Sequence, residues 1–334
     1  MFFTNVLGHE FQKQALRRAV QDSRISHSYI FSGPDGIGKR LTAIEFAKIL
    51  NCVSTYGAGE ADLKNIPCDC PSCKKIEKGI HPDVFLVEYK GAKDIKVDQI
   101  REEVEEKLYF RPFEGRFKVA ILDEAERMNQ NAQNAFLKTL EEPPSDSVII
   151  LITSEPQSLL PTIRSRCQLL EFSPLSEEII VEEITKRKDQ SPDEAVLCAR
   201  LSGGSLGKAL HIDQNLLSQR EKMLTKLSNI NPNRASEVLG FVESLSSEDI
   251  DKLSFMFDVT SLWLRDMVLI KIGFGEDSLS NRDLASVIKQ VAEKQDIEAI
   301  LDKVRFLEKS WYAIFRTNAN KQMVLENLVL KMAE

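Results

Sequence analysis

A glycine-rich segment near the start of the chain has most of the residues of a phosphate-binding loop. Residues 33–39 fit the G-x-x-x-x-G-K pattern, in which backbone N–H groups surround an anion and the lysine reaches a phosphate. The pattern normally continues with Ser or Thr, whose hydroxyl coordinates Mg²⁺, but here the next residue is Arg40. The sequence therefore predicts a nucleotide site that lacks one metal ligand. The residues assigned to the phosphate are Gly33, Gly36, Gly38 and Lys39.

Two acidic residues, Asp123 and Glu124, provide the second half of such a site. They follow the apolar run Val119–Leu122, which is typical of a buried strand. In a P-loop site the first acid holds the water shell of the metal, and the second polarises the attacking water. An apolar run followed by two acids is a weak signal alone, but it gains weight because it follows a phosphate loop.

Four of the six cysteines form a cluster in sequence. Because nothing in the chain indicates secretion, this spacing indicates metal ligation before disulfide bonding. Structural zinc is held by four soft ligands in a closed tetrahedron, which leaves no position for a reacting water. The alternative is a set of reduced thiols in a flexible insert. The predicted ligands are Cys52, Cys68, Cys70 and Cys73.

The first half of the chain alternates short apolar runs with amphipathic segments, which is typical of a parallel α/β sheet. After Phe172 we expect helices only, including a last helix with Leu325, Leu328 and Val329 on one face. The helix after the phosphate loop is expected to bury Ala43, Phe46, Ala47 and Leu50. The predicted strands are Ser28–Phe31, Asp83–Val87, Lys118–Leu122, Val148–Thr153 and Gln168–Phe172.

Size and charge limit the class of protein. A chain of 334 residues predicts two or three domains. The net charge of −7 argues against a protein that binds nucleic acid by itself. The sequence has no run of about 18 apolar residues and no signal-peptide pattern at its start, so we expect a cytoplasmic protein with no membrane segment.

Two further segments make a family resemblance specific. Residues 133–144 (QNAFLKTLEEPP) and the Ser165-Arg166-Cys167 triplet resemble the clamp-loader branch of the AAA+ ATPases, as do residues 6–10 and 26–31. The resemblance extends over nearly the whole chain and is most specific in residues 117–167. It implies an α/β P-loop AAA+ domain over residues 1–172, with helices on both faces of the sheet and a zinc insert near residues 52–73. It also implies a small helical lid domain over 173–212 and an all-α collar domain over 213–334 that mediates oligomerisation.

The resemblance also assigns roles to individual residues. In clamp loaders the arginine of the Ser-Arg-Cys triplet points at the ATP of a neighbouring subunit, and Arg166 matches it. Thr153 or Ser154 matches the first sensor position. A phosphate-sensing arginine of the hydrolysing subunits corresponds here to Gly207. Family members carry a zinc module at the cysteine cluster, usually with two residues between the last three cysteines, whereas this chain has one residue, Asp69, between Cys68 and Cys70.

Three hypotheses follow. The leading one is a stationary clamp-loader subunit that supplies Arg166 in trans during loading of a sliding clamp onto primed DNA, while its own degenerate site does not hydrolyse ATP. The implied partners are the gamma/tau ATPase subunits, the delta subunit, the sliding clamp and primer-template DNA reached through the complex. The alternatives are an active AAA+ ATPase, supported by Lys39, Asp123 and Glu124, and a zinc-bearing scaffold without a role at any ATP site.

Overall fold

The computed structural model describes residues 3–55, 68–89, 94–188, 190–317 and 319–333. These residues form two compact units. The first contains residues 1–180 and 204–207, and the second contains residues 181–203 and 208–334. The central part of the predicted zinc insert, residues 56–67, lies outside the described residues.

The first unit is built on a five-stranded parallel sheet with the order β2-β3-β4-β1-β5. Each strand lies within one or two residues of its predicted bounds. Parallel strands end at the same edge of the sheet, and the register places Val87 of β2 beside Leu122 of β3. The strands are β1 (Ser28–Ser32), β2 (Val84–Val87), β3 (Lys118–Leu122), β4 (Ser147–Thr153) and β5 (Gln168–Glu171).

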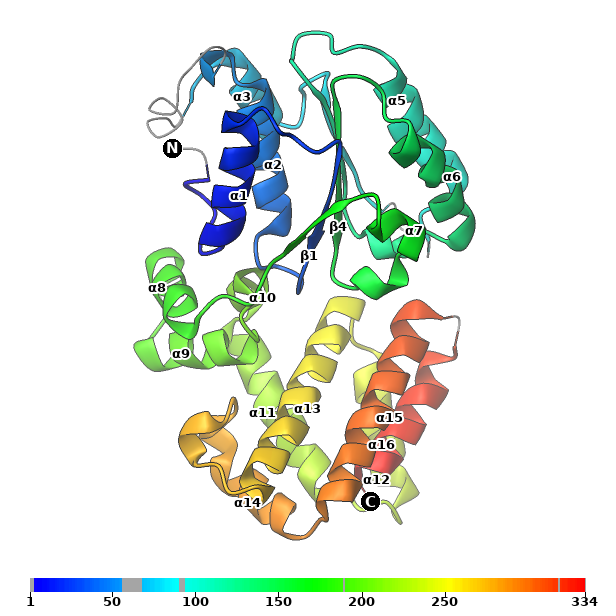
Figure 1. The fold of residues 1–334 in the computed structure, drawn as a ribbon. Helices are drawn as coiled ribbons and strands as arrows, with labels where there is room; N and C mark the ends of the chain where they lie inside the picture. Colours follow the sequence, from blue (N-terminus) through cyan, green and yellow to red (C-terminus); the bar gives the residue numbers. More distant parts are fainter. Residues whose placement is uncertain (1–2, 56–67, 90–93, 189, 318, 334) are drawn as a thin grey trace. The chain divides into compact units, whose positions relative to one another are not determined.

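Helices cover both faces of this sheet, with α1, α2 and α3 on one side and α5 and α6 on the other (Figure 1). Because side chains alternate along a strand, Tyr29 and Phe31 pack into one core while Ile30 packs into the other. The helix after the phosphate loop buries the four predicted residues, Ala43, Phe46, Ala47 and Leu50, in the first of these cores. The helices are α1 (Glu10–Gln21), α2 (Lys39–Asn51), α3 (Pro71–Glu77), α4 (Val97–Ile100), α5 (Glu106–Tyr109), α6 (Gln130–Glu141) and α7 (Pro161–Arg164).

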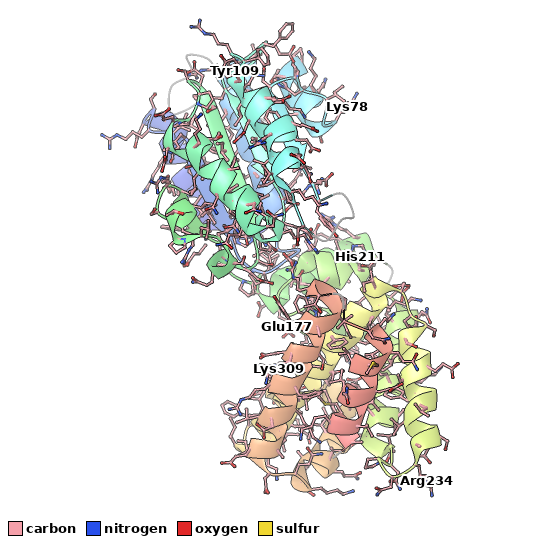
Figure 2. All side chains as sticks on the ribbon, turned by 90° about the vertical axis from the view of Figure 1, so that its right-hand side faces the viewer. Lys78, Tyr109, Glu177, His211, Arg234 and Lys309 are labelled. Carbon is pink, nitrogen blue, oxygen red and sulfur yellow. The ribbon has the colours of Figure 1, made fainter. Side chains whose placement is uncertain are left out.

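A π-helical segment, Arg101–Glu105, joins α4 to α5. The helical stretch ends at Tyr109, whose label in Figure 2 marks the tip of this part of the first unit. Aromatic side chains at this end of the helix and just after it are unusually exposed: Tyr109 is 81% and Phe113 is 85% exposed.

Beyond β5 the described residues contain helices and no further strand, as the sequence predicts. The core of the second unit includes Leu325, Leu328 and Val329 of the last helix, which confirms its predicted buried face. The helices are α8 (Glu177–Arg187), α9 (Pro192–Leu201), α10 (Leu206–His211), α11 (Gln214–Asn229), α12 (Ala235–Ser246), α13 (Ile250–Lys271), α14 (Ala285–Glu293), α15 (Ile297–Arg316) and α16 (Lys321–Ala333).

The predicted fold class, a parallel α/β domain followed by helices, is confirmed by this architecture. Residues 173–212, the predicted lid, are divided between the two compact units. That they form a separate domain stays a prediction. Among the described helices, none combines the length and the apolar character that a membrane span requires.

Candidate nucleotide and metal sites

The phosphate loop joins β1 to α2, which is the strand-to-helix context that the motif requires. Gly36 and Gly38 have φ of 72° and 107°, a region that glycine adopts without a Cβ penalty. Lys39 is 5% exposed, and its ammonium donates to the carbonyls of Gly33 at 2.5 Å and Pro34 at 2.7 Å. Burial lowers the pKa of Lys39, and the nearby carboxylate of Asp35 opposes this shift. The loop is thus formed and carries a lysine at its base.

Arg40 joins the phosphate loop to the acidic end of the sheet. Its Nη1 lies 2.5 Å from Oε1 of Glu88 and 3.6 Å from Oδ2 of Asp123. Asp123 and Glu88 directly follow the neighbouring strands β3 and β2, so their carboxylates meet at one edge of the sheet. Burial raises the pKa of Asp123, although Arg40 acts in the opposite direction. Glu88 was not among the predicted site residues, although it is an acid directly after an apolar strand, which is the signal that identified Asp123.

Glu124 is engaged outside this cluster. Its backbone is left-handed, with φ of 49°, and its Oε2 accepts from Nε of Arg127 at 2.6 Å. Asp123 and Glu124 are thus adjacent in sequence, but their carboxylates have different partners. An open cavity of about 520 Å³ lies beside Arg40 and is lined by Asp35, Gly36, Gly38, Lys39, Arg40, Leu41, Ile44, Asp123, Glu124 and Ile152.

The two candidate sensor residues at the end of β4 have different surroundings. Thr153 is buried, and its hydroxyl accepts from the backbone N–H of Glu155 at 3.0 Å. Its carbonyl accepts from the N–H of Gly33, which ties β4 to the start of the phosphate loop. Ser154 donates to Oε1 of Glu126 at 2.9 Å. Thr153 therefore supports the loop through its backbone.

Gly207 lies against the phosphate loop. Its N–H donates to the carbonyl of Gly36 at 2.8 Å. A Cβ added to Gly207 would lie 2.9 Å from Cα of Gly36, which is closer than real side chains approach. Gly207 is therefore fixed against the phosphate loop by a close backbone contact.

Arg166 follows α7 and is not among the residues that line the cavity. Its Nη2 pairs with Oε1 of Glu141 at 2.7 Å, and its Nη1 donates to the carbonyl of Thr162 at 3.0 Å. The side chains of Arg166 and Glu141 are 35% and 50% exposed. The guanidinium is thus held at the surface by a pair of the kind that typically contributes about 0–1 kcal/mol.

The four cysteines of the predicted cluster lie together. Their sulfurs are all within 4.8 Å of one another, so this group could hold a metal ion. Sγ of Cys52 is 3.3 Å from Sγ of Cys68 and 3.9 Å from Sγ of Cys70. A tetrahedron with metal–sulfur bonds of about 2.3 Å has sulfur–sulfur edges of about 3.8 Å, so these separations fit a four-sulfur site. The single residue between Cys68 and Cys70 does not prevent the sulfurs from converging.

The cluster is positioned by the ends of two helices. Cys52 directly follows α2, whereas Cys70 is the N-cap of α3 and Cys73 lies in its first turn. Although burial alone would raise it, hydrogen bonds from the backbone of Cys73 and Val53 lower the pKa of Cys70 to about 7. Burial raises the pKa of Cys52 to about 11. Metal binding here must therefore displace protons.

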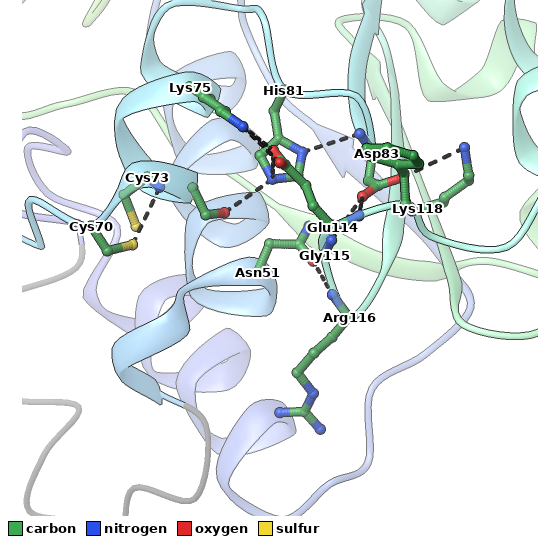
Figure 3. A network of polar contacts seen from close by, with 12 residues as sticks. Asn51, Cys70, Cys73, Lys75, His81, Asp83, Glu114, Gly115, Arg116 and Lys118 are labelled. Atoms are coloured by element: carbon green, nitrogen blue, oxygen red, sulfur yellow. Dashed lines mark hydrogen bonds and ion pairs between the residues drawn. The ribbon is translucent and has the colours of Figure 1, made fainter.

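A buried polar network supports the same helix ends (Figure 3). Oδ1 of Asn51, the last residue of α2, accepts from the N–H groups of Arg116 at 2.8 Å and Phe117 at 2.9 Å. Nε2 of His81 lies 3.0 Å from the hydroxyl of Ser72, which is in α3 between two of the cysteines. The network therefore connects the segment before β3 to both helices that carry the cysteines.

Asp83 is the centre of this network. The side chain is fully buried and accepts from three consecutive N–H groups, those of Phe113 at 2.7 Å and of Glu114 and Gly115 at 2.8 Å. Nζ of Lys118 lies 3.7 Å from Oδ1 of Asp83. Neither Asp83 nor Asn51 was predicted from the sequence, because no local residue pattern reveals the partners of an acid before a strand or of an amide at a helix end.

The fold and the sites together define a P-loop α/β protein with a helical C-terminal part. A family model described as "DNA polymerase III, delta subunit" matches residues 8–176, and a second, for the C-terminal part of that subunit, matches residues 214–334. The chain belongs to the DNA polymerase III delta-subunit family that these models describe.

Curated relatives agree with this assignment. The chain is 33% identical over 325 residues to DNA polymerase III subunit delta' of Bacillus subtilis, with 96% of this chain and 94% of the relative covered. It is 32% identical to subunit delta' of Pseudomonas aeruginosa, with 92% of each covered. Subunit tau of B. subtilis is 29% identical and is covered over 61% of its length. The resemblance to the clamp-loader branch is therefore confirmed, with delta' subunits among the relatives that match over nearly their full length.

Proposed function

We propose that this chain is the delta-prime-like, stationary subunit of a bacterial clamp loader. In this role it supplies Arg166 to the ATP site of a neighbouring subunit. The single observation that carries the proposal is the pair of contacts that Arg40 makes with Glu88 and Asp123. An arginine, which cannot ligate Mg²⁺, occupies the metal side of the home site, while the chain keeps a surface arginine in the Ser-Arg-Cys triplet.

Arg166 has the properties that a donated arginine needs. A guanidinium presents donors in a rigid fork that fits phosphate oxygens, and it stabilises the charge that develops during phosphoryl transfer. Its partner Glu141 is half-exposed, so exchanging this pair for a phosphate has a low cost. The contact with the carbonyl of Thr162 would keep the side chain extended along α7.

The partners follow from the same proposal. They are the gamma/tau ATPase subunits, the delta subunit, the sliding clamp and primer-template DNA, in the cytoplasm. The C-terminal helical region would hold the neighbouring subunits. With a net charge of −7, this chain would share contacts to DNA phosphates with other subunits rather than bind DNA alone.

We also propose that the four clustered cysteines hold a structural Zn²⁺ ion. Zinc prefers tetrahedral thiolate ligands, and four protein ligands leave no position for a catalytic water. The ion would connect the end of α2 to the start of α3, together with the segment that contains Cys68. Its function would be to stabilise this part of the fold.

The test of the leading proposal is the ATPase rate of a reconstituted loader that contains Arg166→Ala. An arginine finger typically accelerates hydrolysis by about 10³ to 10⁵ at the site it serves, so the site next to this subunit should become silent. Arg164→Ala is the matched control, because Arg164 lies two residues away on α7 and pairs with Gln157. Unchanged DNA-stimulated turnover with Arg166→Ala, in a loader that still assembles, would reject the role.

A second candidate function is an active ATPase. The position of Lys39 in a formed loop and the presence of Asp123 favour it. The purified chain would then hydrolyse ATP with Mg²⁺, and Lys39→Ala would abolish the turnover. Two contacts weigh against this function: Glu124 is bound to Arg127, and the metal side of the site is occupied by Arg40.

A further inference from the structure

We propose that the guanidinium of Arg40 replaces Mg²⁺ in the home site, so that the pocket binds a nucleoside diphosphate without a divalent metal. The inference deepens the proposed function, because it gives a specific role to a site that does not hydrolyse ATP. It rests on three observations: the partners of Arg40, the orientation of Lys39, and the open cavity beside them.

The partners of Arg40 are the carboxylates that a metal would need. In P-loop proteins the acid after the strand holds the ion, together with the Ser or Thr hydroxyl that Arg40 replaces here. The guanidinium lies 3.6 Å from Asp123 and 2.5 Å from Glu88, which also lies at the end of a strand. Mg²⁺ requires six oxygen ligands at about 2.0–2.1 Å, usually including several waters. The positive charge of Arg40 beside Asp123 would repel Mg²⁺, and it already pairs with the carboxylate that would bind the ion. These residues therefore do not fit Mg²⁺.

The charges that remain suit a phosphate. Arg40 offsets Asp123, which would otherwise repel an anion at the mouth of the loop. The ammonium of Lys39 donates to two loop carbonyls. Its third partner is the carboxylate of Asp35, whose Oδ1 lies 3.5 Å from Nζ and whose side chain is 70% exposed. An ammonium has three donors, so a phosphate can replace this exposed carboxylate while the two carbonyl contacts hold the lysine in place.

The loop itself supplies the remaining donors. The N–H groups at the start of α2 have no partner within the helix and carry the positive end of its dipole. The adjoining cavity, of about 520 Å³, is within the range of 300–1,000 Å³ that is common for small-molecule sites. The lining contains two cations, Lys39 and Arg40, and three acids, Asp35, Asp123 and Glu124. Asp123 is offset by Arg40 and Glu124 by Arg127, which leaves the exposed Asp35 as the carboxylate that a phosphate displaces from Lys39. A diphosphate suits this site better than a triphosphate, because no metal would be present to neutralise a third phosphate.

Binding of fluorescently labelled ADP to the full chain tests this inference. For the wild-type chain we expect dissociation constants in excess EDTA and in millimolar Mg²⁺ to agree within about twofold. Arg40→Thr restores the hydroxyl and removes the cation. We expect this variant to bind ADP more weakly in EDTA and at least tenfold more tightly when Mg²⁺ is added. Arg101→Thr, an exposed arginine of the π-helical segment, is the control and should behave like the wild type.

Electron paramagnetic resonance with Mn²⁺ gives a second readout. Bound Mn²⁺ is expected in the presence of ADP only for Arg40→Thr. The inference is overturned if wild-type binding needs Mg²⁺, if the wild-type chain does not bind ADP in EDTA, or if Arg40→Thr gains neither Mg²⁺ dependence nor Mn²⁺. None of these results bears on Arg166, whose role is decided by the turnover of the reconstituted loader, so the two failures are distinguishable.

Discussion

The carboxylate of Asp83 is expected to stabilise the first unit more than any surface ion pair near the sites. It is fully buried and accepts three backbone hydrogen bonds of 2.7–2.8 Å. A hydrogen bond to a charged group contributes about 1.5–3 kcal/mol, so three would total about 4.5–9 kcal/mol if they were independent. The donating segment is exposed at Phe113, so its N–H groups can bind water once the carboxylate is removed. This lowers the expected loss of unfolding free energy. We expect Asp83→Ala to lower the free energy of unfolding by about 3–5 kcal/mol, the cost that is typical of removing one partner from a buried charged pair.

The measurement is urea unfolding combined with hydrogen exchange of the amides of residues 113–115. A loss of 3 kcal/mol corresponds to about a 100-fold faster exchange, since each 1.4 kcal/mol is a factor of ten. Asp83→Asn keeps the shape and one acceptor oxygen, so it should show about half of the effect. Asp98→Ala, at an exposed acid of α4, is the control. A loss below 1 kcal/mol with Asp83→Ala, and unchanged exchange at the three amides, would refute the reasoning.

The same carboxylate predicts a pH dependence. Burial alone would raise the pKa of Asp83, but the three backbone hydrogen bonds and Lys118 lower it below the usual value. A lowered pKa in the folded state means that this stabilisation is complete above the unfolded-state pKa of about 3.9. It is lost as the pH falls through the lower, folded-state pKa. The stability difference between wild type and Asp83→Ala should therefore be constant from pH 5 to 7 and shrink in acid below about pH 4. A difference that shrinks already between pH 6 and 5 would contradict this assignment.

Two further predictions concern the cysteine cluster and the loop contact. If the four cysteines hold zinc as proposed, Cys73→Ser should lower the zinc content per chain, whereas Cys198→Ser, at a buried cysteine of α9 outside the cluster, should leave it unchanged. Equal zinc content in both variants would exclude the four-cysteine site. Gly207→Ala should lower the unfolding free energy by about 1–3 kcal/mol, because the new Cβ would lie 2.9 Å from Gly36. Gly240→Ala in α12 has open space around its Cβ and should be neutral or stabilising by up to about 1 kcal/mol, and a similar loss in both variants would argue against the clash.

Local features of this chain could be predicted from residue order alone. The strands, the phosphate loop and the buried face of the last helix depend on neighbours within a few residues, so their patterns are visible in sequence. The convergence of the cysteines was also predictable in outline, because Cys68, Cys70 and Cys73 lie close together in sequence, although a long gap separates them from Cys52. The position of Asp123 and Glu124 after their strand followed from the apolar run Val119–Leu122.

The partners of the charged side chains were decided by tertiary structure. Glu88 lies beside Asp123, where both can contact Arg40, because β2 and β3 are neighbours in register. Gly207 reaches Gly36 across about 170 residues of sequence. Asp83 and Asn51 collect backbone donors from a segment that has no residue pattern of its own. An ion pair or a buried hydrogen bond depends on distances of a few ångströms between segments that are far apart along the chain. Residue types indicate which groups need partners, but only the packing of the sheet and helices determines which partner each group obtains.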